Sequence, residues 1–134
     1  MDEDRKVQAM ERLRGLLDLQ KKIGSRFGGQ GYNVFVFGSY ITTRYKDGKS
    51  DIDIAIYADD FELYLQISTY VEEYFNKKGI ESDIFYIDMN MEASFYCAPL
   101  NSQIQFTDYY PQKLVAFKKN CQNRLDEIKE RMVG

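Results

Sequence analysis

The segment Asp51–Tyr57, with the sequence DIDIAIY, constrains the fold of this chain more than any other part. Isoleucine occupies every second position from Ile52 to Ile56, which is the two-residue period of a β-strand with one buried face. Asp51 and Asp53 then project from the opposite face, with their Cα atoms about 6.5–7 Å apart. The sequence therefore predicts a strand that packs into a hydrophobic core on one side and presents two carboxylates on the other.

Flanking patterns place this strand within a series of helices and strands. Helical spacing of apolar residues, strand-like runs and capping or breaking residues at their ends predict the other elements. The expected order is a helix over about Arg5–Phe27, a strand Tyr32–Phe37, the strand Asp51–Tyr57, a helix from Asp59 or Asp60 to about Lys78, a strand over about Glu81–Asp88 and a long helix beginning near Pro111. Before the last helix we expect a loop with a short helical turn around Asn101–Phe106.

This sequence of elements predicts an α+β fold in which helices and strands alternate along the chain, as in α/β proteins. A small mixed β-sheet is expected, with helices packed on one face. The 134 residues fit a single domain, 1–134, because a chain of this length buries one hydrophobic core. A two-domain enzyme is therefore excluded.

Composition narrows the possible chemistry. The chain contains no histidine, which excludes histidine-dependent triads, histidine zinc sites and imidazole acid–base catalysis. A formal net charge of −3 argues against stable nucleic-acid binding, which needs a basic face. The sequence shows no membrane-spanning apolar run and no signal-like segment. Cys97 and Cys121 have no metal-binding spacing, so we expect two reduced thiols in a cytoplasmic protein.

Gly38 and Ser39 directly follow the first predicted strand, where they are suited to phosphate binding. Glycine lets the backbone approach a ligand closely, and exposed amides at a following helical turn bind anions. Eleven residues separate Ser39 from Asp51. Two close carboxylates repel unless a cation neutralises them, and Mg²⁺ binds carboxylates together with substrate phosphates. The combination of Gly-Ser and the Asp51/Asp53 pair predicts a metal-assisted phosphate site.

The strand after the second helix offers a third carboxylate to the same site. Ile84 and Tyr86 fit its buried face, which places Asp83 on the opposite face. Glu81 is in phase with Asp83 and is the alternative third ligand. Asp88 is out of phase and is expected to be solvated or to cap the strand end. Asp83 is the preferred candidate.

The segments FGSYITTRYKDGKSDIDIAIY and ESDIFYID resemble the minimal nucleotidyltransferases of the DNA polymerase β superfamily. The resemblance covers about Val34–Asp88 and implies transfer of a nucleoside monophosphate from a nucleoside triphosphate to an acceptor hydroxyl. It implies two Mg²⁺ ions and ATP as the leading nucleotide. The implied metal-binding and catalytic residues are Asp51, Asp53 and Asp83. The expected nucleotide contacts are Gly38, Ser39, Arg44, Lys49 and Ser50.

The acceptor and the partner follow from the same resemblance. Minimal members of this family are often antitoxins that adenylylate a tyrosine on a HEPN-type toxin, so a HEPN-type protein partner is the leading expectation. A homodimer is the alternative assembly. Two alternatives remain: a catalytically silent module that neutralises or scaffolds a partner, and an enzyme that modifies a small, antibiotic-like alcohol. The loop Tyr40–Ser50 is one residue longer than is common in the family.

Overall fold

A computed structural model describes residues 2–46 and 49–133 and contains a four-stranded mixed β-sheet with the strand order β3-β2-β1-β4. The strands are β1 (Tyr32–Phe37), β2 (Ile52–Ala58), β3 (Ser82–Tyr86) and β4 (Ile104–Gln105). β2 pairs antiparallel with β1 and parallel with β3, and β4 pairs antiparallel with β1. The expected α+β class with a small mixed sheet is confirmed. The loop predicted over Tyr40–Ser50 includes positions 47 and 48, which lie outside the described residues.

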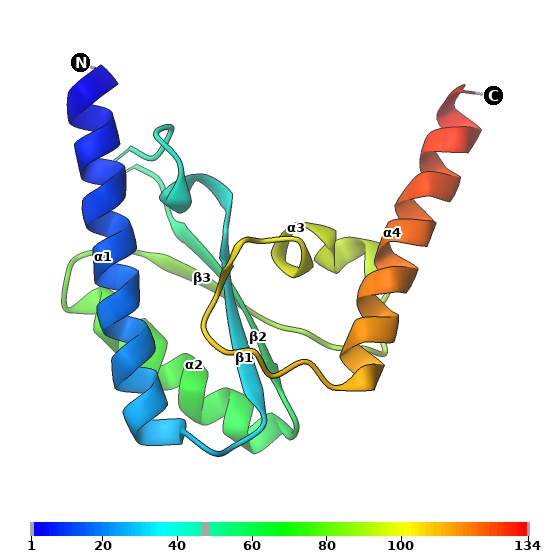
Figure 1. The fold of residues 1–134 in the computed structure, drawn as a ribbon, viewed down its shortest axis with the longest axis horizontal. Helices are drawn as coiled ribbons and strands as arrows, with labels where there is room; N and C mark the ends of the chain where they lie inside the picture. The colour runs from blue at the N-terminus through cyan, green and yellow to red at the C-terminus, as the bar shows by residue number, and fades with distance from the viewer. Residues whose placement is uncertain (1, 47–48, 134) are drawn as a thin grey trace.

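Within the described residues, four α-helices and two 3₁₀ helices surround this sheet. They are α1 (Asp2–Phe27), α2 (Phe61–Asn76), α3 (Cys97–Leu100), α4 (Gln112–Val133), η1 (Gly38–Ile41) and η2 (Ala93–Tyr96). α1 and α4 lie on opposite sides of the sheet, and both extend past the end at which β1 leads into η1 (Figure 1). In the described part of the chain, no helix combines the length and the apolarity that crossing a membrane requires.

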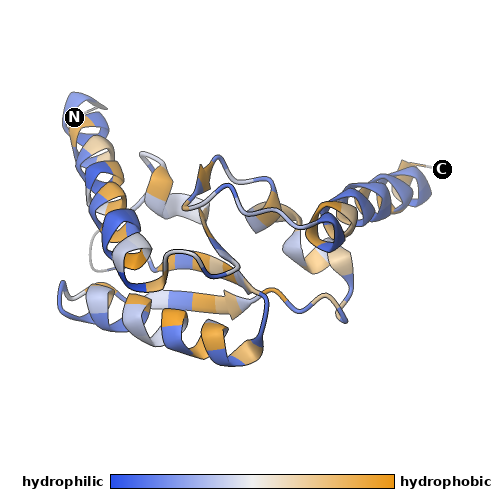
Figure 2. Ribbon diagram, turned by 60° about the horizontal axis from the view of Figure 1, so that its bottom comes forward, coloured by the Kyte–Doolittle hydropathy of each residue, from blue (hydrophilic) through white to orange (hydrophobic). Residues whose placement is uncertain are grey.

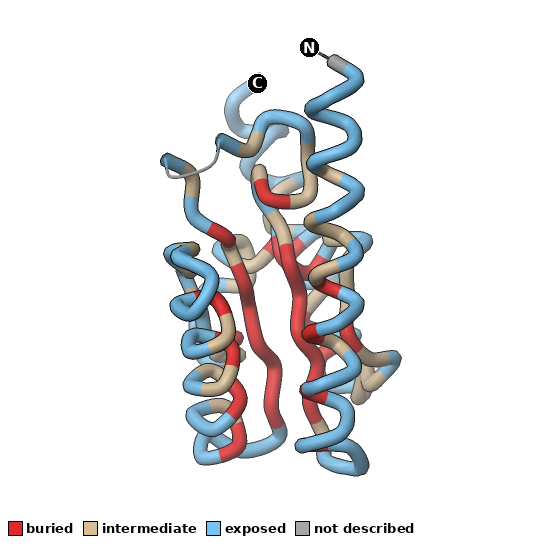
Figure 3. The backbone as a smooth tube through the Cα atoms, turned by 90° about the vertical axis from the view of Figure 1, so that its left-hand side faces the viewer, coloured by how far each residue is buried: buried red, intermediate tan, exposed pale blue. Residues whose placement is uncertain are grey.

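α1 and α2 cover one face of the sheet, as the sequence predicts. The isoleucines of β2 are fully buried there, together with Leu19 and Ile23 of α1 and Ile67 of α2. Figure 2 shows apolar and polar residues alternating along both helices, and Figure 3 shows the buried centre of the sheet between two largely exposed helices. Burial of each such side chain contributes about 1.5–3 kcal/mol, so this face anchors the fold.

The opposite face of the sheet has a second, smaller cover that the sequence pattern did not predict. Phe35 and Tyr57 point to this side and are buried against Leu100 of α3 and Leu114 and Phe117 of α4. This explains why β1 is apolar on both faces: it lies between two layers of helices. The cover reaches only part of this face.

A disulfide links the two helices of this second cover. Cys97 of α3 and Cys121 of α4 are paired, with their Cα atoms 5.6 Å apart, which is the usual spacing for a disulfide. The expectation of two reduced thiols was therefore wrong. Their separation of 24 residues in sequence carries no signal for pairing, and only the packing of α3 against α4 brings them together.

The segment before α4 also differs from the prediction. The helical turn expected around Asn101–Phe106 was wrong, since the helical turns η2 and α3 come earlier and β4 occupies Ile104–Gln105. The hydroxyl of Ser102 donates to the carbonyl of Val36 and accepts from the N–H of Ile104. A two-residue strand has no detectable period, so pairing with the free edge of β1 determines its conformation.

An N-cap begins α2. The carboxylate of Asp60 accepts a hydrogen bond of 2.8 Å from the N–H of Leu63, which satisfies one of the free amides of the first turn. Asp60→Ala is expected to lower the free energy of unfolding by about 1 kcal/mol, as measured by urea denaturation. Asp60→Asn retains the acceptor and is the control; an equal loss in both variants would contradict a capping role.

Candidate active site

Two of the predicted carboxylates lie side by side on adjacent strands. Asp53 of β2 is paired in register with Asp83 of β3 on one side and with Phe37, the last residue of β1, on the other. Residues in one register row share a face, and neighbouring strands lie about 4.8 Å apart. Asp51 precedes β2 and lies two residues from Asp53, on the same face. Asp53 is half-buried, whereas Asp51 and Asp83 are exposed.

Burial and neighbouring charge raise the pKa of Asp53. Loss of solvent around this carboxyl is the largest cause, followed by repulsion from Asp83 and from Asp51. Both effects disfavour the ionised form. Asp51, Asp53 and Asp83 are therefore close enough to repel one another, and a bound cation would relieve this repulsion.

The raised pKa predicts a pH-dependent stability for the metal-free protein. In the folded state, Asp53 keeps its proton to a higher pH than the ordinary pKa of 3.8 would allow. The free energy of unfolding therefore falls as the pH rises from 3.8 through the folded-state pKa, because the folded protein must then carry an unfavourable charge. Asp53→Asn removes the effect. In urea titrations with EDTA, the stability of Asp53→Asn relative to wild type is expected to increase across this pH window and then to level off. A difference that stays constant with pH would contradict the raised pKa.

Gly38 is fitted to the Asp53 carboxylate. Its φ is +79°, a conformation that residues with a side chain rarely adopt, and a Cβ at this position would collide with the carboxylate of Asp53. The turn continues into η1, where the carbonyl of Ser39 accepts hydrogen bonds of 2.9 Å from both the N–H and the hydroxyl of Thr42. The predicted Gly-Ser turn therefore lies directly against the carboxylate of Asp53.

Arg12 of α1 holds the segment that follows this turn, a role that the sequence did not indicate. Its guanidinium donates hydrogen bonds of 2.8 Å each to the carbonyls of Tyr40 and Thr42. Its Cζ atom also lies 4.8 Å from the centroid of the Tyr45 ring, within the range of a cation–π contact. Arg12 is one of several charged residues on a periodic helix, and only the packing of α1 distinguishes it from the others.

Arg12→Ala is expected to destabilise the protein by about 1.5–3 kcal/mol, because hydrogen bonds from a charged group are lost. Trypsin is expected to cleave faster after Arg44 in the loosened loop. Arg12→Lys keeps the charge without the two-pronged geometry and is expected to recover only part of the loss. Arg14→Ala, an exposed neighbour on the same helix, is the control. Equal proteolysis rates in the Arg12 and Arg14 variants would exclude the anchoring role.

The loop residues predicted to contact nucleotide occupy different positions. Lys49, Ser50 and Asp51 line a hollow of about 390 Å³ together with Lys78 and Glu81. The Ser50 hydroxyl accepts from the N–H of Lys46 and so helps to close the loop, in addition to any ligand contact. Lys78 follows α2 and was not singled out by the sequence, since a lysine at a helix end is common.

Arg44 lies apart from this group. It is exposed, its backbone N–H donates to the hydroxyl of Thr42, and it is not among the residues that line the hollow. Lys49 and Ser50 thus share the hollow with Asp51, whereas Arg44 does not line it.

The remaining acidic candidates have local structural roles. Asp88 follows β3, and its carboxylate accepts a hydrogen bond of 2.9 Å from the N–H of Asn90 in the turn after the strand. Glu81 precedes β3 and is exposed in the hollow beside Asp51. Of the acidic residues in and around β3, only Asp83 lies in the register row of Asp53.

Three tyrosines, Tyr40, Tyr45 and Tyr57, lie close in sequence to the Gly-Ser turn or the carboxylates, and a tyrosine ring can stack on a nucleobase. Tyr57 is excluded as a stacking partner because it is 1% exposed and its hydroxyl donates to Asp59, at the end of β2 away from Asp53. Tyr40 is also buried and packs edge-on against Tyr45, with ring centroids 4.9 Å apart. Tyr45 is half-buried and borders the hollow at Asp51.

The carboxylates of the site are suited to Mg²⁺ when water and substrate phosphates supply its remaining ligands. Among residues 2–46 and 49–133, no three Asp, Glu, Cys or His side chains form a cluster that could by itself hold a metal ion. Mg²⁺ usually takes only one or two carboxylates and completes its shell with water and phosphate oxygens. Asp53, whose carboxyl is crowded by Asp51 and Asp83, is suited to such a partial set.

Comparison with known proteins identifies the class to which this fold and site belong. The family described as nucleotidyltransferase domain matches residues 17–132, which is most of the chain. The chain therefore belongs to the nucleotidyltransferase family, and the resemblance to nucleotidyltransferases is confirmed. No curated protein matches the sequence.

One solved structure shares the architecture over most of both chains. It is a crystal structure of a mutant of the toxin–antitoxin pair MntA–HpeT, with a TM-score of 0.56 and 13% sequence identity. The match covers 85% of this chain and 90% of that chain. At this identity the likeness shows the fold alone.

Proposed function

We propose that this protein is a Mg²⁺-dependent nucleotidyltransferase that transfers AMP from ATP to a hydroxyl group on a partner protein. The observation that carries the proposal is the register row of Asp53 and Asp83 next to Gly38, in a chain of the nucleotidyltransferase family. In the reaction, the acceptor oxygen forms a bond to the α-phosphorus. The bond from that phosphorus to the bridging oxygen breaks, and pyrophosphate leaves.

The residues of the site divide this work. Asp51 and Asp53 would hold Mg²⁺, which would offset the negative charge that develops on the departing pyrophosphate. Asp83, exposed beside Asp53, would accept the proton of the attacking hydroxyl, since the chain has no histidine for this task. The backbone at Gly38 and Ser39 would contact the triphosphate, with Lys49 nearby as a cation.

A protein partner is proposed as the source of the hydroxyl. The structural neighbour is part of a toxin–antitoxin pair, so a fold of this kind occurs in complex with a second protein. The proposed partner here is a toxin of the HEPN type, and the proposed acceptor is a tyrosine hydroxyl. In this reading the transfer of AMP inactivates the toxin.

The direct test is calorimetric titration of ATP, GTP, CTP and UTP into the wild type at one fixed salt concentration, with Mg²⁺ and then with EDTA. The Asp51→Asn/Asp53→Asn double variant is the control. ATP is expected to bind the wild type only when Mg²⁺ is present, and the double variant is expected not to bind. Preference for another nucleotide would correct the donor, and binding of none of the four would favour the silent protein-binding module.

A further inference from the structure

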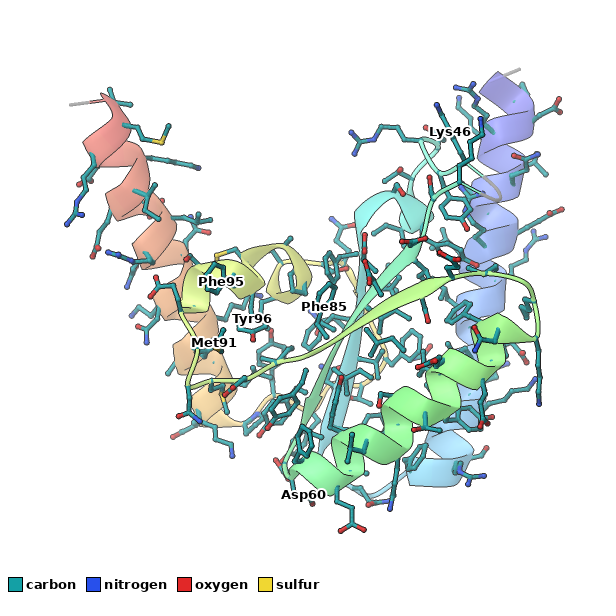
Figure 4. The ribbon with its side chains drawn as sticks, turned by 180° about the vertical axis from the view of Figure 1, so that it is seen from behind. Lys46, Asp60, Phe85, Met91, Phe95 and Tyr96 are labelled. Carbon is teal, nitrogen blue, oxygen red and sulfur yellow. A yellow bond between two sulfur atoms is a disulfide. The ribbon has the colours of Figure 1, made fainter. Side chains whose placement is uncertain are left out.

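An exposed aromatic ring lies on the face of the sheet that carries the carboxylates. Phe85 comes two residues after Asp83 in β3, so the two side chains project from the same face. The side chain of Phe85 is 45% exposed, whereas its register partner Ala55 in β2 and the next residue on this face, Ile87, are buried. Figure 4 shows Phe85 on the side of β3 that faces Tyr96. Nearly half of this side chain is therefore accessible to a ligand bound beside Asp83.

A second ring supports Phe85 from within the sheet. The centroid of the Phe37 ring, at the end of β1, lies 6.3 Å from that of Phe85, and the ring planes are inclined by 40°. β2 lies between β1 and β3, and its residue in register with Phe85 is Ala55, whose small side chain leaves room for the two rings to meet. Contact with the partly buried Phe37 limits the positions that the Phe85 ring can adopt. A ring that is already held in place loses little conformational freedom when it stacks on a ligand.

The order of the strands places Phe85 on one side of the proposed reaction. Gly38 approaches the carboxylate of Asp53 from the β1 side. Asp83 and Phe85 belong to β3, on the opposite side of Asp53. In a displacement at phosphorus, the attacking and leaving oxygens lie roughly in line on opposite sides of the phosphorus. With the triphosphate at the Gly-Ser turn, the acceptor enters from the β3 side, where it meets Asp83 and Phe85.

The proposed base also favours an aromatic acceptor. A carboxylate such as that of Asp83 is a weak base, and the chain has no histidine that could replace it. The hydroxyl of an unperturbed tyrosine has a pKa of about 10, and the aliphatic hydroxyl of serine is far less acidic. Proton transfer to a carboxylate is therefore easier from a phenol than from an aliphatic alcohol. The base and the ring thus select the same class of acceptor.

We infer that Phe85 is a specificity-determining residue: its ring stacks on the aromatic ring of the acceptor, so that the site selects a phenolic hydroxyl over the hydroxyl of serine or threonine. Contact between two rings stabilises a complex by more than the burial of their area alone. This inference rests on the proposed function for the reaction that follows, but the stacking itself requires no transfer of AMP. The nucleobase of ATP is the competing partner of the ring.

The test compares two small acceptor mimics, N-acetyl-L-tyrosinamide and N-acetyl-L-serinamide. Each is titrated into the full chain with Mg²⁺ and a non-hydrolysable ATP analogue, and again without nucleotide, and the shifts of NMR amide signals give its affinity. The wild type is expected to bind the tyrosinamide at least about fivefold more tightly than the serinamide. Phe85→Ala is expected to remove most of this preference by weakening the binding of the tyrosinamide alone. Phe85→Trp keeps a planar ring and is expected to retain the preference.

Phe61→Ala is the matched control. Phe61 of α2 is 54% exposed, but its ring packs against Tyr86 on the opposite face of the sheet, with centroids 5.2 Å apart. This variant is expected to bind both mimics like wild type, and circular dichroism verifies the folding of each variant. Equal or absent binding of the two mimics by the wild type, or a preference unchanged in Phe85→Ala, would overturn the inference.

Nucleotide titrations separate the remaining possibilities. Mg²⁺–ATP and Mg²⁺–tripolyphosphate are each expected to bind Phe85→Ala as tightly as they bind the wild type. Weaker binding of Mg²⁺–ATP alone would assign the ring to the nucleobase and overturn its role toward the acceptor. Binding of Mg²⁺–ATP by a wild type that shows no preference for the tyrosinamide would overturn this inference alone. A preference that depends on Phe85, in a wild type that binds no nucleotide, would overturn the proposed function alone.

Discussion

An Asp53→Asn variant is expected to bind Mg²⁺–ATP at least about 100-fold more weakly than wild type and to be at least as stable at neutral pH. Removing an anionic ligand costs several kcal/mol of metal-assisted binding, and each 1.4 kcal/mol is tenfold in affinity. The same change relieves the repulsion among Asp51, Asp53 and Asp83 in the metal-free protein. Titration calorimetry measures the affinity, and urea denaturation with EDTA measures the stability.

The opposite signs of these two effects distinguish a binding site from a structural carboxylate. Asp88→Asn is the matched control, because Asn can also accept the hydrogen bond from Asn90 and Asp88 lies outside the register row. It is expected to retain nucleotide affinity. A loss of stability in Asp53→Asn, or nucleotide affinity equal to that of Asp88→Asn, would contradict the proposed role.

Gly38→Ala is expected to lower both stability and nucleotide binding. A side chain at a φ of +79° costs about 1–2 kcal/mol in backbone strain, and the new Cβ would also push against the Asp53 carboxylate. Either the turn or the carboxylate must move, so nucleotide affinity is expected to fall by at least about tenfold, equivalent to 1.4 kcal/mol. Urea denaturation and titration calorimetry measure the two effects.

Gly29→Ala is a control of matched strain. Gly29 has a φ of +85°, but a Cβ there would meet nothing within 4 Å. It is expected to lose a similar amount of stability from backbone strain and to keep full nucleotide affinity. If both glycine variants lost the same affinity, the contact between Gly38 and Asp53 would have no part in binding.

The main elements were predictable because their signals are local. Alternating isoleucines predicted β2, and an N-cap at Asp59 or Asp60 predicted the start of α2, where the structure shows Asp60 as the cap. β4 and the turns before it were not predictable, because two residues of strand have no period and take their conformation from the edge of β1. Helical spacing also predicted an apolar stripe along all of α1, yet Val7 and Met10 are about half exposed because the helix extends past the sheet (Figure 1).

The carboxylates were predictable for the same reason. The two-residue period of a strand dictates that Asp51 and Asp53 share a face, and the same parity selects Asp83 in β3. Arg12 was not predictable, because its two backbone acceptors are 28 and 30 residues away and neither belongs to a motif. Arg44 shows that closeness in sequence is not enough. It lies seven residues before Asp51, yet it does not line the hollow that Asp51 borders.

The sequence by itself determined β1, β2 and β3, their faces and the residue types at the site, since these depend on periodicities of two and about four residues. Tertiary structure alone decided three things: the register that sets Asp83 beside Asp53, the pairing of Cys97 with Cys121, and how far along α4 its apolar stripe is buried. The register and the cysteine pair join residues that are distant in sequence, and the exposed part of the α4 stripe depends on where the hydrophobic core ends. Local propensity carries no information about such contacts, because they form only when the hydrophobic faces of separate elements pack together.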